Sequence, residues 1–223
     1  MSVLIITEDT VTQLPQVEKW TNKIRKGQDI VNDIEILQLL KIHNLTIPSD
    51  DLKKEKTYKS ILKNYVRPAK FMFSAVFSEV RDFANELAVF TQTDLYIISG
   101  RYGLINENDK IIPYSKTVKT SIELADLDRK TDFVKSIQRL IGQHAVTIFL
   151  LPSEYIKFLL IIGFFNTIPK NHKVVIVSST QNNFILKKYP NFITLSRKGL
   201  ARLGVTNRKK IIDIITKYTN PEN

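Results

Sequence analysis

Short runs of apolar, mostly β-branched residues recur along this 223-residue chain and constrain its fold more than any other feature. They lie at residues 3–6, 95–98, 145–151 and 173–178, with helix-like apolar spacing between them. Strands that are apolar along nearly their whole length are typical of sheets covered on both faces. Their alternation with helices indicates an α/β fold. We therefore predict a single α/β domain over residues 1–223, with a central mixed or parallel sheet and flanking helices.

The helical segments follow from apolar residues spaced three and four positions apart. This spacing predicts helices over residues 71–90, 120–142 and 152–165. Residues 8–66 are polar and mostly helical in period, so we interpret them as a helical insertion near the N-terminus. The loops at 99–103, 152–155 and 178–181 follow the carboxyl ends of strands. We expect them to gather on one edge of the sheet, where ligands usually bind in such folds.

The charge of the chain is strongly unbalanced. It has 33 Lys and Arg residues against 22 Asp and Glu, which gives a formal net charge of +11. Nucleic acid is the partner that such a surplus favours. The alternative is a basic protein whose abundant Lys, Asn and Ile reflect only an AT-rich coding sequence.

The surplus is concentrated near the C-terminus. Residues 187–217 hold nine basic residues and one acidic residue. The pattern predicts a basic helical hairpin, similar to half of a helix-hairpin-helix element. A short helix ends at Leu203, Gly204 takes a left-handed conformation, and a second helix runs from Arg208 to Lys217. Phosphate groups are the predicted ligands of this hairpin, and structural closure of the fold is the alternative. The predicted contact residues are Lys198, Arg202, Gly204, Thr206, Arg208, Lys209 and Lys210.

A tight turn follows the strand at 95–98. It reads Ser99-Gly-Arg-Tyr-Gly103, and Pro113-Tyr114 follows ten residues later. The glycines let the backbone approach a ligand closely. Tyr102 and Tyr114 are candidates to stack on a planar base, and Arg101 is a candidate to bind a phosphate or a base edge.

These motifs resemble those of the YaaA (peroxide stress) superfamily and its small uncharacterised relatives. The similar segments are Arg67-Pro-Ala with Phe73-Ser-Ala75, the strand with Ser99 to Gly103, Ile111 to Tyr114, and 148–155. The resemblance covers roughly residues 66–200 and assigns 66–186 to a YaaA-like core. Phe73-Ser-Ala75 stands where the family has a Tyr-Thr-Gly segment.

The resemblance implies an α/β fold with a positively charged cleft that binds DNA and a helix-hairpin-helix-like element. Relatives are linked to 7-deazaguanine modification of DNA, so base-directed chemistry is implied as well. We expect a base or nucleotide pocket formed by Arg67, Ser74, Ser99, Gly100, Arg101, Tyr102, Gly103 and Pro113.

Candidates for catalysis are few. The chain has no Cys, which excludes thiol catalysis and thiolate metal sites. Its three His residues are isolated and lack metal-ligand spacing, so we predict no metal and no cofactor. Glu154, at a strand end, and Tyr114 are the candidates for proton transfer. A nuclease-like set of Asp94, Glu107 and Lys110 is only a loose match.

Three functions therefore remain open. The first is a DNA-binding protein of the YaaA-like superfamily. The second is an enzyme that modifies or excises a nucleobase. The third is a non-catalytic subunit of a nucleic-acid-associated assembly, with residues 8–66 contacting a protein partner. The longest apolar run, at 155–165, is too short for a membrane span and contains Lys157, so we expect no membrane partner and a cytoplasmic location.

Overall fold

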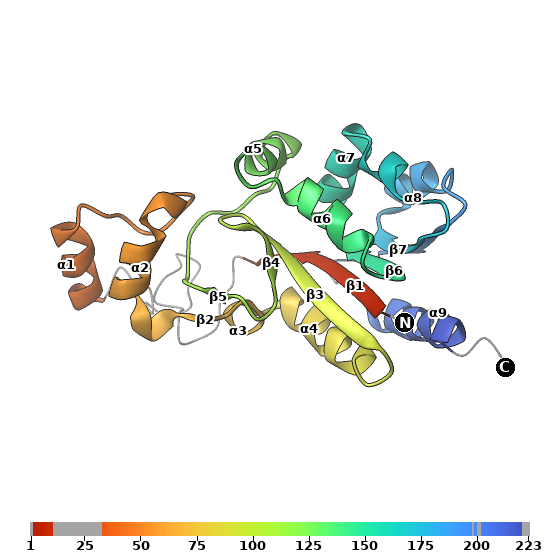
Figure 1. Ribbon diagram of the computed structural model, residues 1–223, viewed down its shortest axis with the longest axis horizontal. Coiled ribbons are helices and arrows are strands. Elements are labelled where there is room, and N and C mark those ends of the chain that lie inside the picture. The colour runs from red at the N-terminus through yellow and green to blue at the C-terminus, as the bar shows by residue number, and fades with distance from the viewer. Residues whose placement is uncertain (1, 11–32, 198, 200–201, 220–223) are drawn as a thin grey trace.

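A six-stranded mixed sheet forms the centre of the protein (Figure 1). The computed structural model describes residues 2–10, 33–197, 199 and 202–219. The strand order is β4-β3-β1-β6-β7-β8, and every neighbouring pair is parallel except the antiparallel β3-β4 hairpin. The strands are β1 (Ser2–Glu8), β3 (Gln92–Ser99), β4 (Gly103–Asn106), β6 (Val146–Leu150), β7 (Lys173–Ser178) and β8 (Phe192–Ser196). The predicted α/β class and mixed sheet are confirmed.

The central strand β1 is buried on both faces, which explains its unbroken apolar run. Val3 and Ile5 belong to the hydrophobic cluster on one face, and Leu4 and Ile6 belong to the cluster on the other. Successive side chains of a strand point to opposite faces. A strand between two helical layers therefore has no solvated face on which polar residues would be retained.

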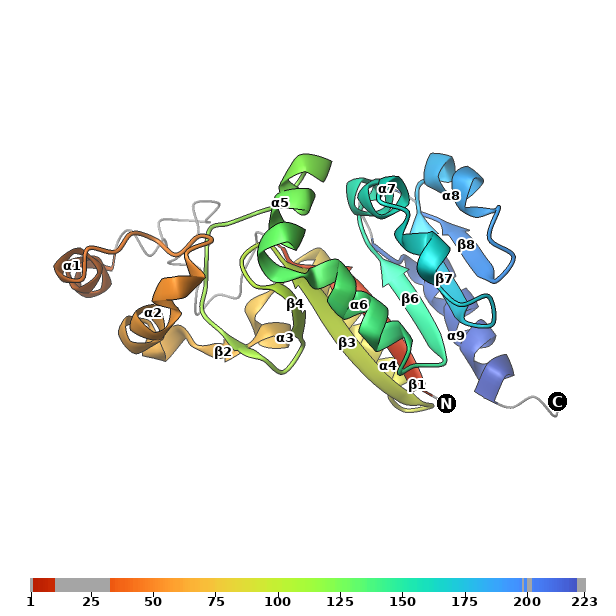
Figure 2. The same ribbon diagram turned by 45° about the horizontal axis from the view of Figure 1, so that its top comes forward.

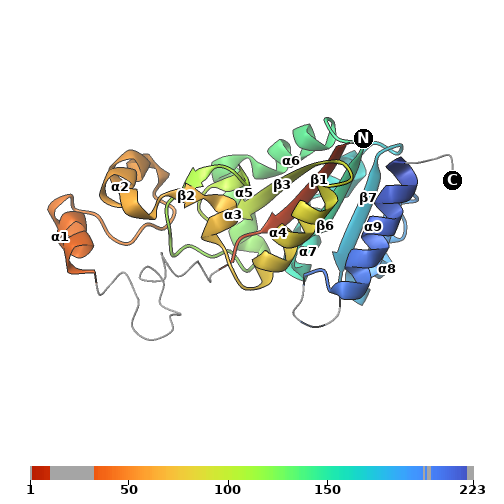
Figure 3. The same ribbon diagram turned by 90° about the horizontal axis from the view of Figure 1, so that it is seen from below.

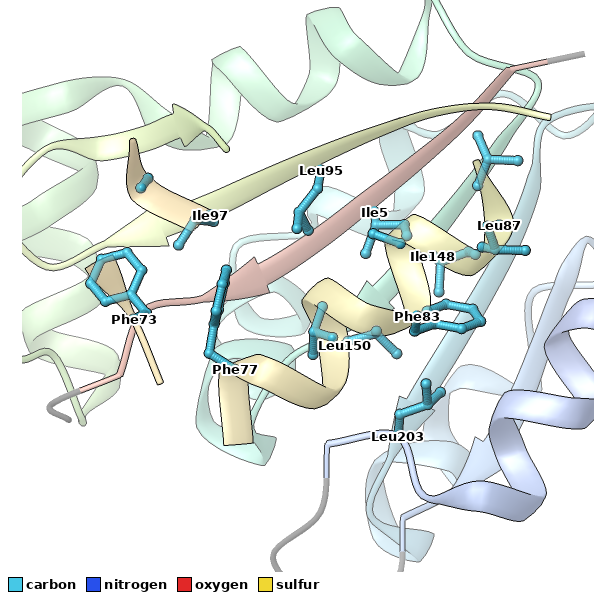
Figure 4. Packing of buried hydrophobic residues seen from close by; sticks show 14 of the residues in the cluster. Ile5, Phe73, Phe77, Phe83, Leu87, Leu95, Ile97, Ile148, Leu150 and Leu203 are labelled. Atoms are coloured by element: carbon cyan, nitrogen blue, oxygen red, sulfur yellow. The ribbon is translucent and has the colours of Figure 1, made fainter. Parts of the chain in front are cut away.

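Helices α4 (Val76–Leu87) and α9 (Val205–Thr219) cover one face of the sheet (Figure 3). Phe77 and Phe83 of α4 point toward the strands, where Figure 4 places Ile5, Leu95 and Ile148. Phe73, expected inside this helix, precedes it in extended conformation, yet its side chain is buried in the same cluster.

Four helices cover the opposite face: α5 (Ser121–Thr131), α6 (Phe133–Ile141), α7 (Ser153–Ile161) and α8 (Thr180–Leu186) (Figure 2). The prediction of one helix over 120–142 is wrong, because Asp132 takes a left-handed conformation (φ +51°) and separates α5 from α6. The predicted helix from 152 ends at Ile161 and is followed by a 3₁₀ turn, η5 (Phe164–Thr167).

Residues 34–65 form an arm at one end of the molecule (Figures 1 and 3). It contains α1 (Ile34–Ile42), η3 (Leu52–Lys54), α2 (Glu55–Ile61) and η4 (Lys63–Tyr65). Leu40, Tyr58 and Leu62 form a small core with Ile112. Strand β2 (Arg67–Pro68) pairs with β5 (Lys110–Ile111), and α3 (Ala69–Met72) follows. Residues 11–32 of the predicted insertion lie outside the described residues.

The C-terminal segment is helical only in part. Helix α9 begins at Val205, earlier than predicted, and Gly204 has the predicted left-handed conformation (φ +74°). The described residues before it, Arg197, Gly199, Arg202 and Leu203, are loop, turn and bend. The predicted first helix of the hairpin is therefore not confirmed. Among the described residues, none of the helices has the length and apolar character that a membrane crossing needs.

The order of the strands sets where a ligand is expected. From β1 the chain passes through α4 to β3 on one side, whereas β6, β7 and β8 follow one another on the other side. The order in which strands are added to the sheet therefore reverses between β1 and β6. In open α/β sheets, the crevice outside the carboxyl ends of the strands at this point is the usual ligand site.

We predict that Gly103→Ala destabilises the fold by roughly 2–4 kcal/mol. Gly103 has φ +73°, and an added Cβ would collide with the Thr131 side chain of α5. Left-handed strain costs about 1 kcal/mol, and overpacking adds about 1–3 kcal/mol. The matched control is Gly204→Ala, which has the same strain (φ +74°) but meets nothing within 4 Å. Equal losses for the two variants in urea unfolding would contradict the predicted clash.

Candidate functional site

The loops that follow the parallel strands meet at one edge of the sheet, which we call the carboxyl edge. The register aligns Glu8 with Ile98, Thr7 with Leu150, and Ser178 with Ser196. The turns at 99–103, 152–155 and 178–181 therefore lie at this edge, as expected from the sequence. Residues 8–10 at the end of β1 join them there.

A cavity of about 300 Å³ opens between the ends of β1 and β6, at the position where the order of the strands reverses. We call it the edge cavity. Its volume is at the lower end of those that enclose small organic ligands. Its walls are Glu8, Asp9, Thr117, Val118, Lys119, Pro152, Ser153, Glu154 and Tyr155.

Arg202 crosses the carboxyl edge and binds the end of β1. Its Nη1 donates to the Glu8 carbonyl at 2.8 Å and to Thr7 Oγ1 at 3.2 Å, and its Nη2 donates to the Asp9 carbonyl at 3.0 Å. The same Nη2 lies 2.5 Å from Glu8 Oε1. The guanidinium is 2% exposed, so these contacts hold an ion pair in the interior.

Glu8 is paired through only one of its carboxylate oxygens. Oε1 meets Arg202, whereas Oε2 is buried and has no hydrogen-bond partner among the described residues. Burial raises the pKa of Glu8 from 4.5 to about 7, although the nearby Arg202 and Arg197 charges oppose the shift. Both protonation states of this carboxyl are therefore populated near neutral pH, which is the property of a general acid or base.

Asp9 joins the end of β1 to the strand turn. Tyr114 Oη donates to Asp9 Oδ2 in a short hydrogen bond, and the Gly100 N–H donates to the same oxygen at 2.8 Å. Ser99 Oγ lies 2.7 Å from Tyr114 Oη. Burial raises the pKa of Asp9 despite these donors, and burial with the Asp9 charge raises the pKa of Tyr114 well above its ordinary value.

A second buried arginine, Arg101, ties the arm to the strand turn. Its guanidinium contacts Asp51 at 2.6 Å and Glu55 at 2.9 Å, and it donates to the Ser49 carbonyl at 2.8 Å. Tyr102 Oη donates to Glu55 at 2.9 Å. The side chain of Arg101 is fully buried, so its charge serves the arm rather than an open surface.

The predicted pocket residues of the strand turn are divided among several places. Gly100 and Arg101 line a separate cavity of about 640 Å³ between the arm and α5. Tyr102 lines a third cavity, beside Glu55 and β5. The Tyr102 and Tyr114 rings contact each other edge to face, with centroids 5.7 Å apart, instead of facing one space.

The remaining members of that set do not line the edge cavity either. Ser99 binds Tyr114, Gly103 starts β4, and Pro113 is buried. Arg67 lies in β2, and the Ser74 carbonyl accepts a hydrogen bond from Thr10. The set therefore surrounds the strand turn without forming one pocket.

Of the two predicted catalytic residues, Glu154 lines the edge cavity and Tyr114 does not. Glu154, in the first turn of α7, lines it and is exposed, 3.9 Å from Lys157. Tyr114 is 4% exposed and reaches the cavity only through Asp9.

The residues predicted to contact phosphate differ from one another in burial and in their hydrogen-bond partners. Arg202 is buried, Arg208 pairs with Glu86 at 2.5 Å, and the Gly204 N–H donates to Glu79 at 2.6 Å. Thr206, Lys209 and Lys210 are exposed on α9. Lys198 lies outside the described residues.

The sequence analysis missed Glu8 and Asp9 as site residues. Two consecutive acids at the end of a buried first strand were the available signal. Such acids lie at the carboxyl edge in a parallel sheet, where ligands bind. Within the described ranges, no group of three or more His, Asp or Glu side chains is placed to hold a metal ion.

Glu8 makes the stability of the fold depend on pH. The folded chain binds the Glu8 proton more tightly than the unfolded chain, so this stabilisation is complete below about pH 4.5 and is lost as pH rises through about 7. We predict that the unfolding free energy of the wild type, relative to Glu8→Gln, falls by roughly 2–3 kcal/mol from pH 5 to pH 8. Urea unfolding across this range measures it. A constant difference would contradict the raised pKa.

We predict that Arg101→Leu destabilises the protein by about 3–5 kcal/mol, because it leaves Asp51 and Glu55 without their buried partner. Lys130→Ala is the control, because Lys130 of α5 also pairs with the arm, through Asp50. It removes the exposed Lys130–Asp50 ion pair and is expected to cost under about 1 kcal/mol. Urea unfolding compares the two, and similar losses would show that Arg101 does not fasten the arm.

Comparison of the chain with protein-family models, with curated proteins and with solved structures finds no match.

Proposed function

We propose that this protein binds nucleic acid, DNA in the first place, and admits a single base or nucleotide into the edge cavity. The main support for the proposal is that the basic start of α9 and the edge cavity share one edge of the sheet. The start of α9, with its exposed lysines, lies at the same edge of the sheet as the cavity.

The path of the chain supports this shared location. Strand β8 ends at Ser196 on the carboxyl edge, and the following segment brings Arg202 to the end of β1. Helix α9 then begins at Val205 and runs back along the sheet (Figure 3). Lys209 and Lys210 in its second turn are exposed. We expect them to bind the backbone of a strand whose base reaches the cavity.

The charge of the molecule supports the choice of partner. A net charge of +11 attracts a polyanion over long distances. Lysine contacts to phosphate do not depend on sequence, and they release counterions. The resemblance of residues 66–200 to the YaaA superfamily, whose members have a DNA-binding cleft, points to the same partner.

A second candidate, an enzyme acting on a nucleobase, is favoured by Glu8. A buried carboxyl with a pKa of about 7 on the wall of a cavity is typical of acid–base catalysis. The third function, a subunit of an assembly, stays a prediction. The exposed side chains of Ile34 and Ile42 on α1 favour a protein partner for the arm.

We predict that Lys209→Ala with Lys210→Ala lowers the slope of log Kobs against log [salt] for double-stranded DNA by about 2. Binding should weaken to a similar degree for unrelated sequences. Fluorescence anisotropy of a labelled duplex over a salt series measures this slope.

The matched control is Lys187→Ala with Lys188→Ala. These exposed lysines lie between the end of α8 and the start of β8, toward the opposite edge of the sheet. Their loss should leave the slope almost unchanged. An unchanged slope for the Lys209 and Lys210 pair, or equal effects of both pairs, would refute the proposed binding edge.

A further inference from the structure

We infer that Glu8 is the residue that transfers a proton to a ring nitrogen of the base held in the edge cavity. The inference rests on the proposed function and deepens it. It assigns to Glu8 the acid–base role for which the sequence favoured Glu154 and Tyr114.

The first support is the orphaned oxygen of Glu8. The residue is 8% exposed and lines the edge cavity, and its Oε2 has no partner among the described residues. A buried polar atom without a hydrogen bond costs roughly 1–3 kcal/mol, and more when it is charged. Such an atom in a residue that lines a cavity is explained if a ligand supplies the missing partner.

The second support is the fixed position of the carboxyl group. Arg202 Nη2 binds Oε1, and the same guanidinium binds the Glu8 and Asp9 carbonyls. The paired oxygen and its backbone are therefore held, while Oε2 has no partner among the described residues. When Glu8 loses its proton, the negative charge forms beside the Arg202 cation.

The third support comes from comparing the ionisable groups around the cavity. Arg202 and Arg197 approach Glu8 from the segment before α9, Asp9 follows it in the chain, and Tyr155 faces it from α7. Lys119 and Glu154 line the same cavity. Asp9 Oδ2 is occupied by Tyr114 and Gly100, and Glu154 is exposed. Only Glu8, among the described carboxyls lining this cavity, combines burial with an orphaned oxygen.

The proton-transfer step is balanced without any further reactant. The O–H bond at Glu8 Oε2 breaks, and the lone pair of a ring nitrogen forms a new N–H bond. The carboxylate keeps the bonding electrons and is stabilised by Arg202. A base protonated on a ring nitrogen is a better leaving group from its sugar and a better electrophile, so this step promotes both excision and exchange of such a base.

The test is the pH dependence of nucleoside binding to the full chain. Adenosine, guanosine, cytidine and thymidine are each titrated at pH 6 and pH 8 by NMR. A Glu8 carboxyl with a pKa of about 7 is about tenfold less protonated at pH 8 than at pH 6. We expect at least one nucleoside to bind about tenfold more weakly at pH 8 and to shift the amide signals of Ser153 and Tyr155.

Two variants separate the rival assignments. Glu8→Gln should abolish the pH dependence, whereas Glu154→Gln should retain it. Loss of the pH dependence in Glu154→Gln, with Glu8→Gln unchanged, would overturn the inference. The NMR chemical shift of the Glu8 carboxyl carbon, followed against pH in the unmodified protein, gives a titration curve independent of any variant. Its midpoint should lie near pH 7 and move when the nucleoside binds, and a fixed midpoint overturns the inference.

The salt series with duplex DNA distinguishes failure of the role given to Glu8 from failure of the proposed function. Steep salt dependence without pH-dependent nucleoside binding would overturn the role of Glu8 and leave nucleic-acid binding standing. Loss of both would overturn the proposed function as well.

Discussion

The contact of Arg202 with the end of β1 is the interaction on which the carboxyl edge depends. One guanidinium satisfies the Glu8 and Asp9 carbonyls and pairs with the Glu8 side chain. A buried ion pair gains little over an apolar pair in net stability, but removing one partner is costly. The main effect of this ion pair is therefore to fix the positions of the two chain segments rather than to add net stability. It holds the segment before α9 across the edge and fixes a carboxyl on the wall of the cavity.

Arg101 does for the arm what Arg202 does for the C-terminal segment. Each is a fully desolvated cation at the carboxyl edge that fastens a distant stretch of chain to the sheet. The apolar core covers both faces of the sheet and reaches this edge through residues such as Val118 and Tyr155. Directional contacts to charged groups are suited to such a place because they fix orientation as well as distance.

Much of the sheet could be predicted from the sequence because strands buried on both faces need apolar residues at nearly every position. Strand β8 was missed because it is a short edge strand, half-buried along most of its length. The break between α5 and α6 was missed because Asp132 takes the left-handed conformation without a Gly or Pro to indicate it. The site was harder to predict. The sequence placed the strand ends at one edge, but the burial of Glu8 depends on Arg202, 194 positions further along the chain.

That separation determines when the site forms. Strand β1 is made before residue 202, and until residue 202 has been made Glu8 ends a strand without its counter-ion. A contact between such distant residues closes a very large loop, which is entropically late in folding. The ion pair of the buried acid therefore forms only after the segment before α9 has been made. A partly made chain exposes Glu8 to water, where a glutamate has an ordinary pKa, so the chemistry of the cavity is restricted to fully folded molecules.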